Sequence, residues 1–429
     1  MKRFDYLMIG NSAAAIGAVE AVREAGADGS IGIVSNEPYH VYSRPRISER
    51  ITRHAPVKSL SYRPPDFYRK HAVTPILGVA AVEIALKQKT VRLENGRELG
   101  YGKLLLATGA RPTHLPIPGI DLDGVHYFTT LHQADGLARD LANIRHAVVI
   151  GAGPIGIQAA ETLTRTGVKV TVVEALDRIL ALAVDEHASS LVRKLFQKHG
   201  VSILTSSRVQ EIHGSAAGRA CGVTLVDGTR MDCEAVIVAA GVSPRTDLAE
   251  SVGIRVKAGI VVDSSMQTSE PDVYAAGDVA ETLDLLTGQK RLMPIWPNAY
   301  MQGRTAGLAM ARLRGVSYPG SISINATHFF EFPVISAGCI DPSDGCTELV
   351  DLNKRTGYYR RIVLKQNVPV GIVMAGDAVD RAGLVVDLIK NKVDASAFLD
   401  KLARPDFNNA HLPPELRETK RGGKTHEGH

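Results

Sequence analysis

The feature that most constrains this fold is a pattern that occurs twice: an apolar run, a glycine-rich turn and then a run of small residues. The first copy reads Phe4-Asp-Tyr-Leu-Met-Ile-Gly-Asn-Ser-Ala-Ala-Ala15, and the second, about 140 residues later, reads His146-Ala-Val-Val-Ile-Gly-Ala-Gly-Pro-Ile-Gly156. A buried strand that turns tightly into a helix begins a Rossmann-type unit, which binds a dinucleotide at the turn. The sequence therefore predicts an α/β fold with two Rossmann-like dinucleotide-binding domains.

The second loop has the complete Gly-x-Gly-x-x-Gly spacing. Its glycines allow a tight turn, a close approach of the backbone to a pyrophosphate, and close packing of helix on strand. Glu174 follows the next apolar run, where a carboxylate binds the adenosine ribose and repels a 2′-phosphate, so we expect NADH rather than NADPH. The alternative is that these glycines belong to ordinary turns, but it does not explain why a strand, a helix and an acidic residue follow at the spacing of the motif. The candidate NAD-binding residues are Gly151, Gly153, Pro154, Ile155, Gly156, Glu174 and Gly241.

The first loop is a variant of the motif. Ser12 and Ala15 stand where the second and third glycines are expected, and such small residues still permit a close approach at some steric cost. Glu37 and Ser35 are the candidates for the ribose hydroxyls on this side. Taken alone, this loop fits a nucleotide site and an ordinary turn equally well.

Three further segments connect the two loops to a known family. The runs 104–112, 236–245 and 271–280 resemble the linker and flavin motifs of the pyridine nucleotide-disulfide oxidoreductase class, which are flavoproteins with two dinucleotide-binding domains. Residues 296–303, reading Trp-Pro-Asn-Ala-Tyr-Met-Gln-Gly, resemble its rubredoxin, ferredoxin and nitrite reductase branch. The resemblance implies FAD on the first loop, with Asp278 accepting a hydrogen bond from the ribityl chain, and NADH on the second. The FAD-binding residues it implies are Gly10, Ser12, Ala13, Ala14, Glu37, Arg44, Thr108, Gly109, Arg111, Gly277, Asp278 and Asn298.

A helix is predicted from Pro297 to Arg312. Proline suits the first helical position, and Ala299, Gly303 and Ala306 are small enough for tight packing. The positive end of this helix would favour the anionic reduced flavin. A core helix that packs on the sheet is a compatible second reading.

The position of the cysteines argues against a thiol relay. No cysteine occurs between Met1 and Ala220, whereas the disulfide reductases and peroxidases of this class carry reactive cysteines near the first domain's second strand. Cys339 and Cys346 are expected to be buried apolar residues, with a bridge or a metal site as the alternative, and we expect no metal site.

The segment Tyr42-Ser-Arg-Pro45 resembles the Tyr-x-Arg-Pro segment of the reductase branch, in which the arginine lies along FAD. A guanidinium suits pyrophosphate because it donates two parallel hydrogen bonds. Glu49 stands where relatives place a lysine near the flavin, and Gln158 stands where they place a glutamate near the nicotinamide. These two residues are the candidates near the reacting rings, and no catalytic residue is assigned.

The domain order follows from the resemblance. The FAD domain would comprise residues 1–112 and 243–322, and the NAD domain would comprise 113–242. A smaller C-terminal α+β domain at 323–403 would contain strands at 359–365 and 370–375 and a helix at 382–391. A polar tail, 404–429, would have no fixed structure without a partner.

Composition excludes several classes of protein. The net charge of +5 over 429 residues gives little support for nucleic-acid binding. The sequence contains no run of 18 uncharged apolar residues and no signal peptide, and it has only four cysteines, so we expect a cytoplasmic protein without a membrane span.

A basic stretch runs from Arg44 to His71. Its eight arginines and lysines outnumber Glu49 and Asp66, and it should lie near the flavin. One hypothesis is that it docks an acidic electron carrier or an iron-sulfur subunit. The alternative, a solvated basic surface, has equal weight.

The predicted function is an FAD-dependent NADH:acceptor oxidoreductase that passes electrons to an external carrier or partner subunit in a homo- or hetero-oligomer. The pattern Gly376-Asp-Ala-Val-Asp-Arg-Ala-Gly383, with the Gly10 loop, resembles the NADH-linked subunit of phenylglyoxylate (2-oxoacid) dehydrogenase complexes. The alternatives are a free-standing rubredoxin or ferredoxin reductase, an NADH oxidase, and a redox-sensing interaction protein resembling apoptosis-inducing factor.

Overall fold

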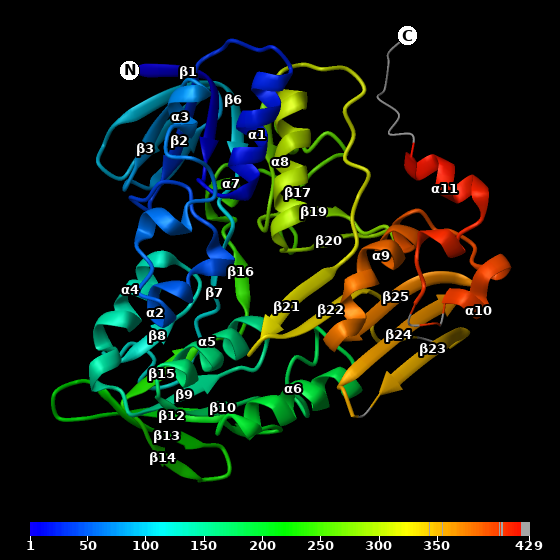
Figure 1. Cartoon of the computed structure of the whole chain (residues 1–429). Coiled ribbons are helices and arrows are strands. Elements are labelled where there is room, and N and C mark those ends of the chain that lie inside the picture. Colours follow the sequence, from blue (N-terminus) through cyan, green and yellow to red (C-terminus); the bar gives the residue numbers. More distant parts are fainter. Residues whose placement is uncertain (343, 354, 403, 405, 422–429) are drawn as a thin grey trace. The chain divides into compact units, whose positions relative to one another are not determined.

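The computed structural model describes residues 1–342, 344–353, 355–402, 404 and 406–421 (Figure 1). Its contacts divide the chain into two units. The first contains Met1–Ala175 and Gly200–Ser321, and the second contains Leu176–His199 and the chain from Ile322 onward.

The first unit contains the sheet predicted to hold the first loop. The strand order is β3 (Val73–Leu77), β2 (Ile31–Ser35), β1 (Lys2–Ile9), β6 (Glu98–Leu106), β5 (Thr90–Leu93) and β4 (Ala81–Ala85), and β18 (Val273–Ala275) also pairs with β6. Strands β2, β1, β6 and β18 run parallel, with Ile9 beside Val34 and Leu106, and Leu106 beside Ala275. Their carboxyl ends therefore meet at one edge of the sheet, which is where ligands bind in open α/β sheets.

A second parallel sheet in this unit has the order β11 (Ser202–Leu204), β10 (Lys169–Val173), β9 (His146–Ile150), β15 (Ala235–Val238) and β8 (Val125–Tyr127). Helices α4 (Leu131–Asp140) and α5 (Pro154–Arg165) pack on it, and an antiparallel sheet of β12 (Val209–Gly214), β13 (Ala220–Leu225) and β14 (Arg230–Asp232) adds to its core. Strands β7 (Ala110–Pro112) and β16 (Val242–Pro244) pair with each other in antiparallel orientation. They lie at the predicted crossing, where the chain passes from one predicted domain to the other.

The remaining elements of the first unit are short. They are α2 (Glu49–Thr52), α3 (Phe67–Lys70), α7 (Asp247–Glu250), β17 (Ile260–Val261), β19 (Ala280–Leu283), β20 (Lys290–Leu292) and the 3-10 turns at Arg44–Arg46, Val57–Leu60 and Leu141–Asn143.

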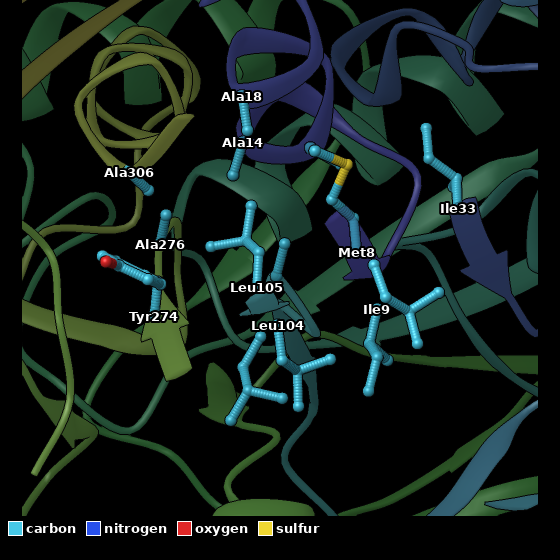
Figure 2. Close-up of a cluster of buried hydrophobic side chains, with 14 of the residues drawn as sticks. Met8, Ile9, Ala14, Ala18, Ile33, Leu104, Leu105, Tyr274, Ala276 and Ala306 are labelled. Carbon is cyan, nitrogen blue, oxygen red and sulfur yellow. The ribbon is translucent and has the colours of Figure 1, made fainter. Parts of the chain in front are cut away.

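Helices α1 (Ala13–Glu24) and α8 (Trp296–Met310) lie side by side against the first sheet (Figure 1). Glycine makes their close approach possible: a Cβ on Gly303 would lie 1.9 Å from the carbonyl oxygen of Ala14, and one on Gly307 would lie 2.4 Å from that of Ala18. In Figure 2, Ala14, Ala276 and Ala306 gather between these helices and the sheet. The predicted helix is confirmed, with its observed start one residue earlier and its end two residues earlier than expected.

The second unit is built on an antiparallel sheet with the order β21 (Ile324–Phe329), β22 (Phe332–Gly338), β25 (Val368–Ala375), β24 (Tyr358–Lys365) and β23 (Cys346–Asn353). Helix α9 (Ala382–Lys390) packs on β25, preceded by a 3-10 helix at Gly376–Arg381. The predicted strands and helix of the C-terminal domain are confirmed. Shorter elements follow: a 3-10 turn at Ser396–Phe398, α10 (Leu399–Leu402), a second 3-10 turn at Asn409–His411, and α11 (Pro414–Arg421).

Helix α6 (Glu186–Lys198) also belongs to this second unit, although the expected boundaries place it in the NAD domain. Buried Asp185 caps it through the N–H of Ala188, at 2.9 Å, and also accepts hydrogen bonds from the Tyr359 hydroxyl, at 2.6 Å, and from Arg361, at 3.1 Å. This buried polar network, which no local sequence signal marks, explains the difference.

The structure after residue 404 also differs from the expected polar tail. Phe407 and Leu412 are 0% and 2% exposed, so the hydrophobic core of the second unit extends beyond residue 404. Residues 422–429 lie outside the described part of the chain. No helix in the described ranges is both long and apolar enough to cross a bilayer.

Candidate functional site

The first glycine-rich loop lies at the carboxyl end of β1. The N–H of Gly10 donates to Val34 O at 2.8 Å, and its φ of +123° is one that only glycine adopts easily. A Cβ there would lie 2.0 Å from the carbonyl oxygen of Ala107. Ser12 is the N-cap of α1 but makes no side-chain cap, so the first N–H groups of the helix, with buried Ala13 and Ala14, remain available to an anion.

The second feature of this edge is a carboxylate without a partner. Asp278 follows Gly277 at the end of β18, and its side chain accepts no hydrogen bond from any described residue. Burial raises the pKa of Asp278, while the positive charge of Arg44 opposes that shift. Asn298, in the first turn of α8, is 7% exposed, and its Nδ2 also has no hydrogen-bond partner among the described residues. An open acceptor on half-buried Asp278 and an open donor on buried Asn298, beside an uncapped helix, fit the hydroxyl groups and phosphates of FAD.

Arg44 is held from two directions. It pairs with Glu37 and donates to Thr129 O at 3.1 Å, and its guanidinium lies 5.4 Å from the centre of the Tyr42 ring. Burial opposes its charge, but Tyr42 and Glu37 outweigh burial and raise the pKa of Arg44. The Tyr42 hydroxyl donates to Glu37 at 2.6 Å. Glu37, expected to bind ribose, is therefore already engaged by two side chains, and sequence reasoning missed the role of Tyr42.

The other expected FAD residues lie where β6 ends. The Thr108 hydroxyl donates to Arg245 O at 2.8 Å, and Gly109 takes a φ of +68°. Arg111 forms a bidentate pair with Asp247, at 2.9 and 3.0 Å, on the exposed β7–β16 crossing. The structure thus places Thr108 and Gly109 near the first loop and commits the Arg111 guanidinium to Asp247.

The second loop repeats the geometry of the first at the end of β9. The N–H of Gly151 donates to Val173 O at 2.8 Å, and a Cβ on Gly151 would lie 2.5 Å from Ala239 O. A Cβ on Gly156 would lie 2.0 Å from Gly151 O, whereas one on Gly153 would meet nothing within 4 Å. Gly153 thus faces open space, as close approach to a pyrophosphate requires. The neighbouring expected residues take matching positions: Pro154 begins α5, Ile155 follows it half-buried, and Gly241 has a φ of +97°.

Glu174 lies directly after β10, as expected. One of its carboxylate oxygens accepts from the N–H of Ala152 at 2.6 Å, so the acid also braces its own loop.

The two candidates near the reacting rings lie on adjoining segments. Gln158, on α5, donates from Nε2 to Pro45 O at 3.0 Å. Glu49, on α2, pairs with Arg46 at 2.7 Å, and this hydrogen bond lowers the pKa of Glu49. Gln158 therefore joins the helix of the second loop to the segment that carries Arg44, which brings the two predicted dinucleotide sites together.

Most of the basic stretch is paired with acids. Five of its arginines contact a carboxylate: Arg44, Arg46, Arg50, Arg63 and Arg69. Arg53, Lys58 and Lys70 are exposed and make no ion pair with described residues.

All four cysteines are free thiols, and no cluster of metal-ligating side chains is found in the described part of the chain. Cys339 and Cys346 were expected to be buried, but both are only half-buried, because the chain around them lies near the surface of the second unit.

Comparison with known proteins agrees with this geometry. Residues 4–303 match the family model described as pyridine nucleotide-disulphide oxidoreductase, and residues 324–393 match the rubredoxin NAD+ reductase C-terminal domain. The chain is 33% identical over 390 residues to the NADH-dependent phenylglyoxylate dehydrogenase subunit epsilon of Aromatoleum evansii, covering 91% of this chain and 92% of that protein.

Two further relatives join the comparison. The chain is 30% identical to the assimilatory nitrate reductase electron transfer subunit of Bacillus subtilis, covering 95% of this chain but only 52% of that longer protein. A solved covalent complex of putidaredoxin reductase with putidaredoxin contains a chain with a TM-score of 0.82 and 25% identity, covering 92% of this chain and 94% of that one. The chain therefore belongs to the pyridine nucleotide-disulphide oxidoreductase family and is an oxidoreductase that uses FAD and NADH.

Proposed function

We propose that this protein is the NADH-linked electron-transfer component of a larger oxidoreductase, passing electrons from NADH through FAD to a separate carrier or partner subunit. The observation that carries the proposal is the contact of Gln158 with Pro45, which joins two glycine-loop sites within one unit. The sequence has no cysteine before Cys221 to relay electrons inside the chain. The relatives named above include subunits of complexes and a reductase solved with its carrier.

We propose these roles for the residues of the site. The first loop and the uncapped start of α1 bind the FAD pyrophosphate, and Arg44 balances its charge. Asp278 accepts from a ribityl hydroxyl, and Asn298 donates from Nδ2 to the flavin. FAD held by these residues would supply an acceptor for the hydride of NADH and a donor of electrons to the next carrier.

On the other side of the site, the second loop binds the pyrophosphate of NADH, and Glu174 binds its ribose. Hydride transfer depends on position and on exclusion of water rather than on an acid or a base. Gln158 is uncharged, so its role is to hold Pro45 and the segment around it.

The domain boundaries at residues 112, 242 and 322 are part of this proposal. The mixed first sheet and the parallel second sheet fall within the ranges expected for the FAD and NAD domains. We also propose a cytoplasmic location from the low cysteine content; recovery of the protein outside the cytoplasmic fraction would contradict it.

We propose an acidic electron carrier or iron-sulfur subunit as the partner, docked over Arg53, Lys58 and Lys70. These charges are exposed and unpaired among the described residues, whereas their basic neighbours are neutralised. Replacing all three by glutamine should lower the rate with an acidic carrier at low salt and flatten its salt dependence. Unchanged salt dependence would favour a merely solvated surface.

The decisive experiment is anaerobic stopped-flow reduction of the purified protein by NADH and by NADPH, followed by mixing with oxygen, benzyl viologen or ferredoxin. Fast reduction by NADH, fast reoxidation by viologen and slow reoxidation by oxygen are expected. Rapid oxygen consumption would favour an NADH oxidase or a free-standing reductase. Very slow reoxidation by every acceptor, with a change of oligomeric state, would favour a redox-sensing protein. Absence of reduction would contradict the proposal.

A further inference from the structure

Gln302 lies in the second turn of α8 and is 1% exposed. Its carboxamide is used at both ends. Oε1 accepts from the N–H of Gly277 at 2.8 Å, and Nε2 donates to the Thr282 hydroxyl at 3.1 Å. A buried glutamine with both ends satisfied makes a rigid connection, because losing either bond would leave a polar group unpaired away from water.

The turn that Gln302 holds is the one that ends in Asp278. β18 stays hydrogen-bonded to β6 as far as Ala276, whose N–H donates to Leu106 O at 3.1 Å. Beyond that point the chain leaves the sheet, and Gly277 adopts a φ of +86°. The Gln302 side chain is then the hydrogen-bond acceptor that replaces the sheet for the N–H of Gly277.

Asp278 depends on this turn for its position. Its carboxylate accepts no hydrogen bond from the described residues, so none of them anchors it by such a bond. The peptide between Gly277 and Asp278 must therefore fix where the carboxylate points. Gly277 itself fits closely, since a Cβ on it would lie 3.3 Å from the Ala14 Cβ and 3.6 Å from the Ala299 Cβ.

We propose that Gln302 is a positioning residue for FAD: through Gly277 it holds Asp278 where the carboxylate meets the ribityl chain. This inference rests on the proposed role of Asp278. Gln302 is 1% exposed and its carboxamide is bonded to Gly277 and Thr282, so we expect its effect to pass through the turn. The class of ligand recognised is a polyol chain, whose hydroxyls need an acceptor held at a fixed place.

The experiment measures FAD affinity of the apoprotein by fluorescence titration, with apoprotein melting temperature and flavin midpoint potential alongside. Gln302→Leu removes both bonds and is expected to weaken FAD binding by about 10- to 100-fold. Gln302→Glu keeps an acceptor for Gly277 and should recover part of that affinity. Thr282→Val removes only the far anchor and should have a smaller effect in the same direction.

Glu234→Leu is the matched control. Glu234 also accepts backbone N–H bonds, from Arg145 at 3.1 Å and His146 at 2.9 Å, but at the amino end of β9. This variant should lower the melting temperature without changing FAD affinity. An equal loss of FAD affinity in Glu234→Leu would show that the effect of Gln302→Leu is general destabilisation and would overturn the proposal.

A double-mutant cycle with Asp278→Ala tests whether Gln302 acts through Asp278. If it does, adding Gln302→Leu to Asp278→Ala should cost clearly less than Gln302→Leu costs alone. Fully additive losses, or unchanged affinity in a folded Gln302→Leu protein, would overturn the proposal. If Gln302→Leu does not fold, Gln302→Glu and Thr282→Val decide the same question. Failure of the unmodified protein to bind FAD would instead contradict the proposed function as well.

Discussion

The two glycine-rich loops share one backbone geometry and differ in what surrounds them. In each, the first glycine donates at 2.8 Å to the neighbouring strand, and in each a Cβ on that glycine would collide with a carbonyl oxygen, that of Ala107 or Ala239. The first loop is then covered by α8, which packs on α1 through Gly303. The second loop leaves open space at Gly153.

The space at the third position explains why one loop departs from the glycine consensus there and the other keeps it. In the first loop, Ala15 stands at the third position and is 0% exposed, so the site tolerates a methyl group. In the second, a Cβ on Gly156 would lie 2.0 Å from Gly151 O. The first loop is therefore built into the core, whereas the second loop leaves open space at its middle glycine.

The largest expected effect is at the first loop, which α8 covers. Gly303→Val places a branched side chain where even a Cβ would lie 1.9 Å from Ala14 O, so it should cost about 3 kcal/mol of stability or more and release FAD. Thermal melts and flavin absorbance after gel filtration measure both. Gly136→Ala, in α4, is the control, because its Cβ would meet only Arg139 at 3.9 Å, and it should leave stability unchanged or raise it by up to about 1 kcal/mol. A stable, yellow Gly303→Val protein would contradict the covered-loop interpretation.

At the second loop, Gly153→Ala should weaken NADH binding without affecting folding. Its Cβ meets nothing within 4 Å in the protein, yet it enters the space expected for pyrophosphate. NADH affinity should fall by about tenfold or more, while the melting temperature and FAD content stay constant. Stopped-flow reduction at increasing NADH concentrations measures the affinity. Unchanged NADH binding would place the dinucleotide elsewhere.

A smaller effect is expected on coenzyme choice. Glu174→Gln keeps an oxygen acceptor for the N–H of Ala152 but removes the charge that repels a 2′-phosphate. The preference for NADH over NADPH should narrow by about tenfold, corresponding to about 1.4 kcal/mol. Reduction rates with each coenzyme give the ratio. An unaltered ratio would show that another residue selects the coenzyme.

A substitution at the opposite edge of the first sheet should change the stability of the protein but not its cofactor binding. Asp272 pairs with Lys103 and Lys89, whose hydrogen bonds lower the pKa of Asp272 below its ordinary value of 3.8. A carboxyl with a lowered folded pKa stabilises the protein above its unfolded pKa and loses that effect as pH falls through the folded one. Asp272→Asn should therefore cost about 1 kcal/mol at pH 7 and progressively less below about pH 4, with FAD affinity unchanged. Urea unfolding across that range measures it, and a gap that stays constant with pH would contradict the assignment.

The smallest effect concerns the thiols. Cys233 is 3% exposed, and burial raises its pKa to about 12, so it should react with a thiol reagent only after unfolding. Half-buried Cys221, Cys339 and Cys346 should react in the native protein. Because no thiolate relay is proposed, their modification should leave the rate of flavin reduction by NADH unchanged. A large loss of that rate would revive a cysteine mechanism.

Local signals in the sequence were sufficient for much of the fold. The strand, turn and helix around Gly10 and Gly151 were predictable because a tight turn with positive φ admits little except glycine. The helix near Pro297 and strands β24 and β25 were likewise marked by proline, by small residues and by apolar runs.

The candidate site was predictable in outline, but the ion pairs that its arginines form were not. The sequence marked Glu37, Arg44 and Arg111 as ligands of FAD, yet the structure joins Arg44 to Glu37 and Arg111 to Asp247. The fold decides which carboxylate pairs with each arginine, because any carboxylate nearby can accept its hydrogen bonds. Such pairs have no fixed spacing in the sequence by which they could be predicted.

What the sequence by itself determined is the pair of dinucleotide loops and, through them, the family and its cofactors. Only the tertiary structure showed that Gln302 holds the turn before Asp278, and that Asp185 joins α6 to Tyr359 in the second unit. Both contacts connect buried polar groups, and the pairing of Asp185 with Tyr359 spans 174 positions along the chain. The physical reason is that glycine turns and amphipathic periods act over a few residues, whereas a buried hydrogen bond is set by whichever groups the packed core brings together.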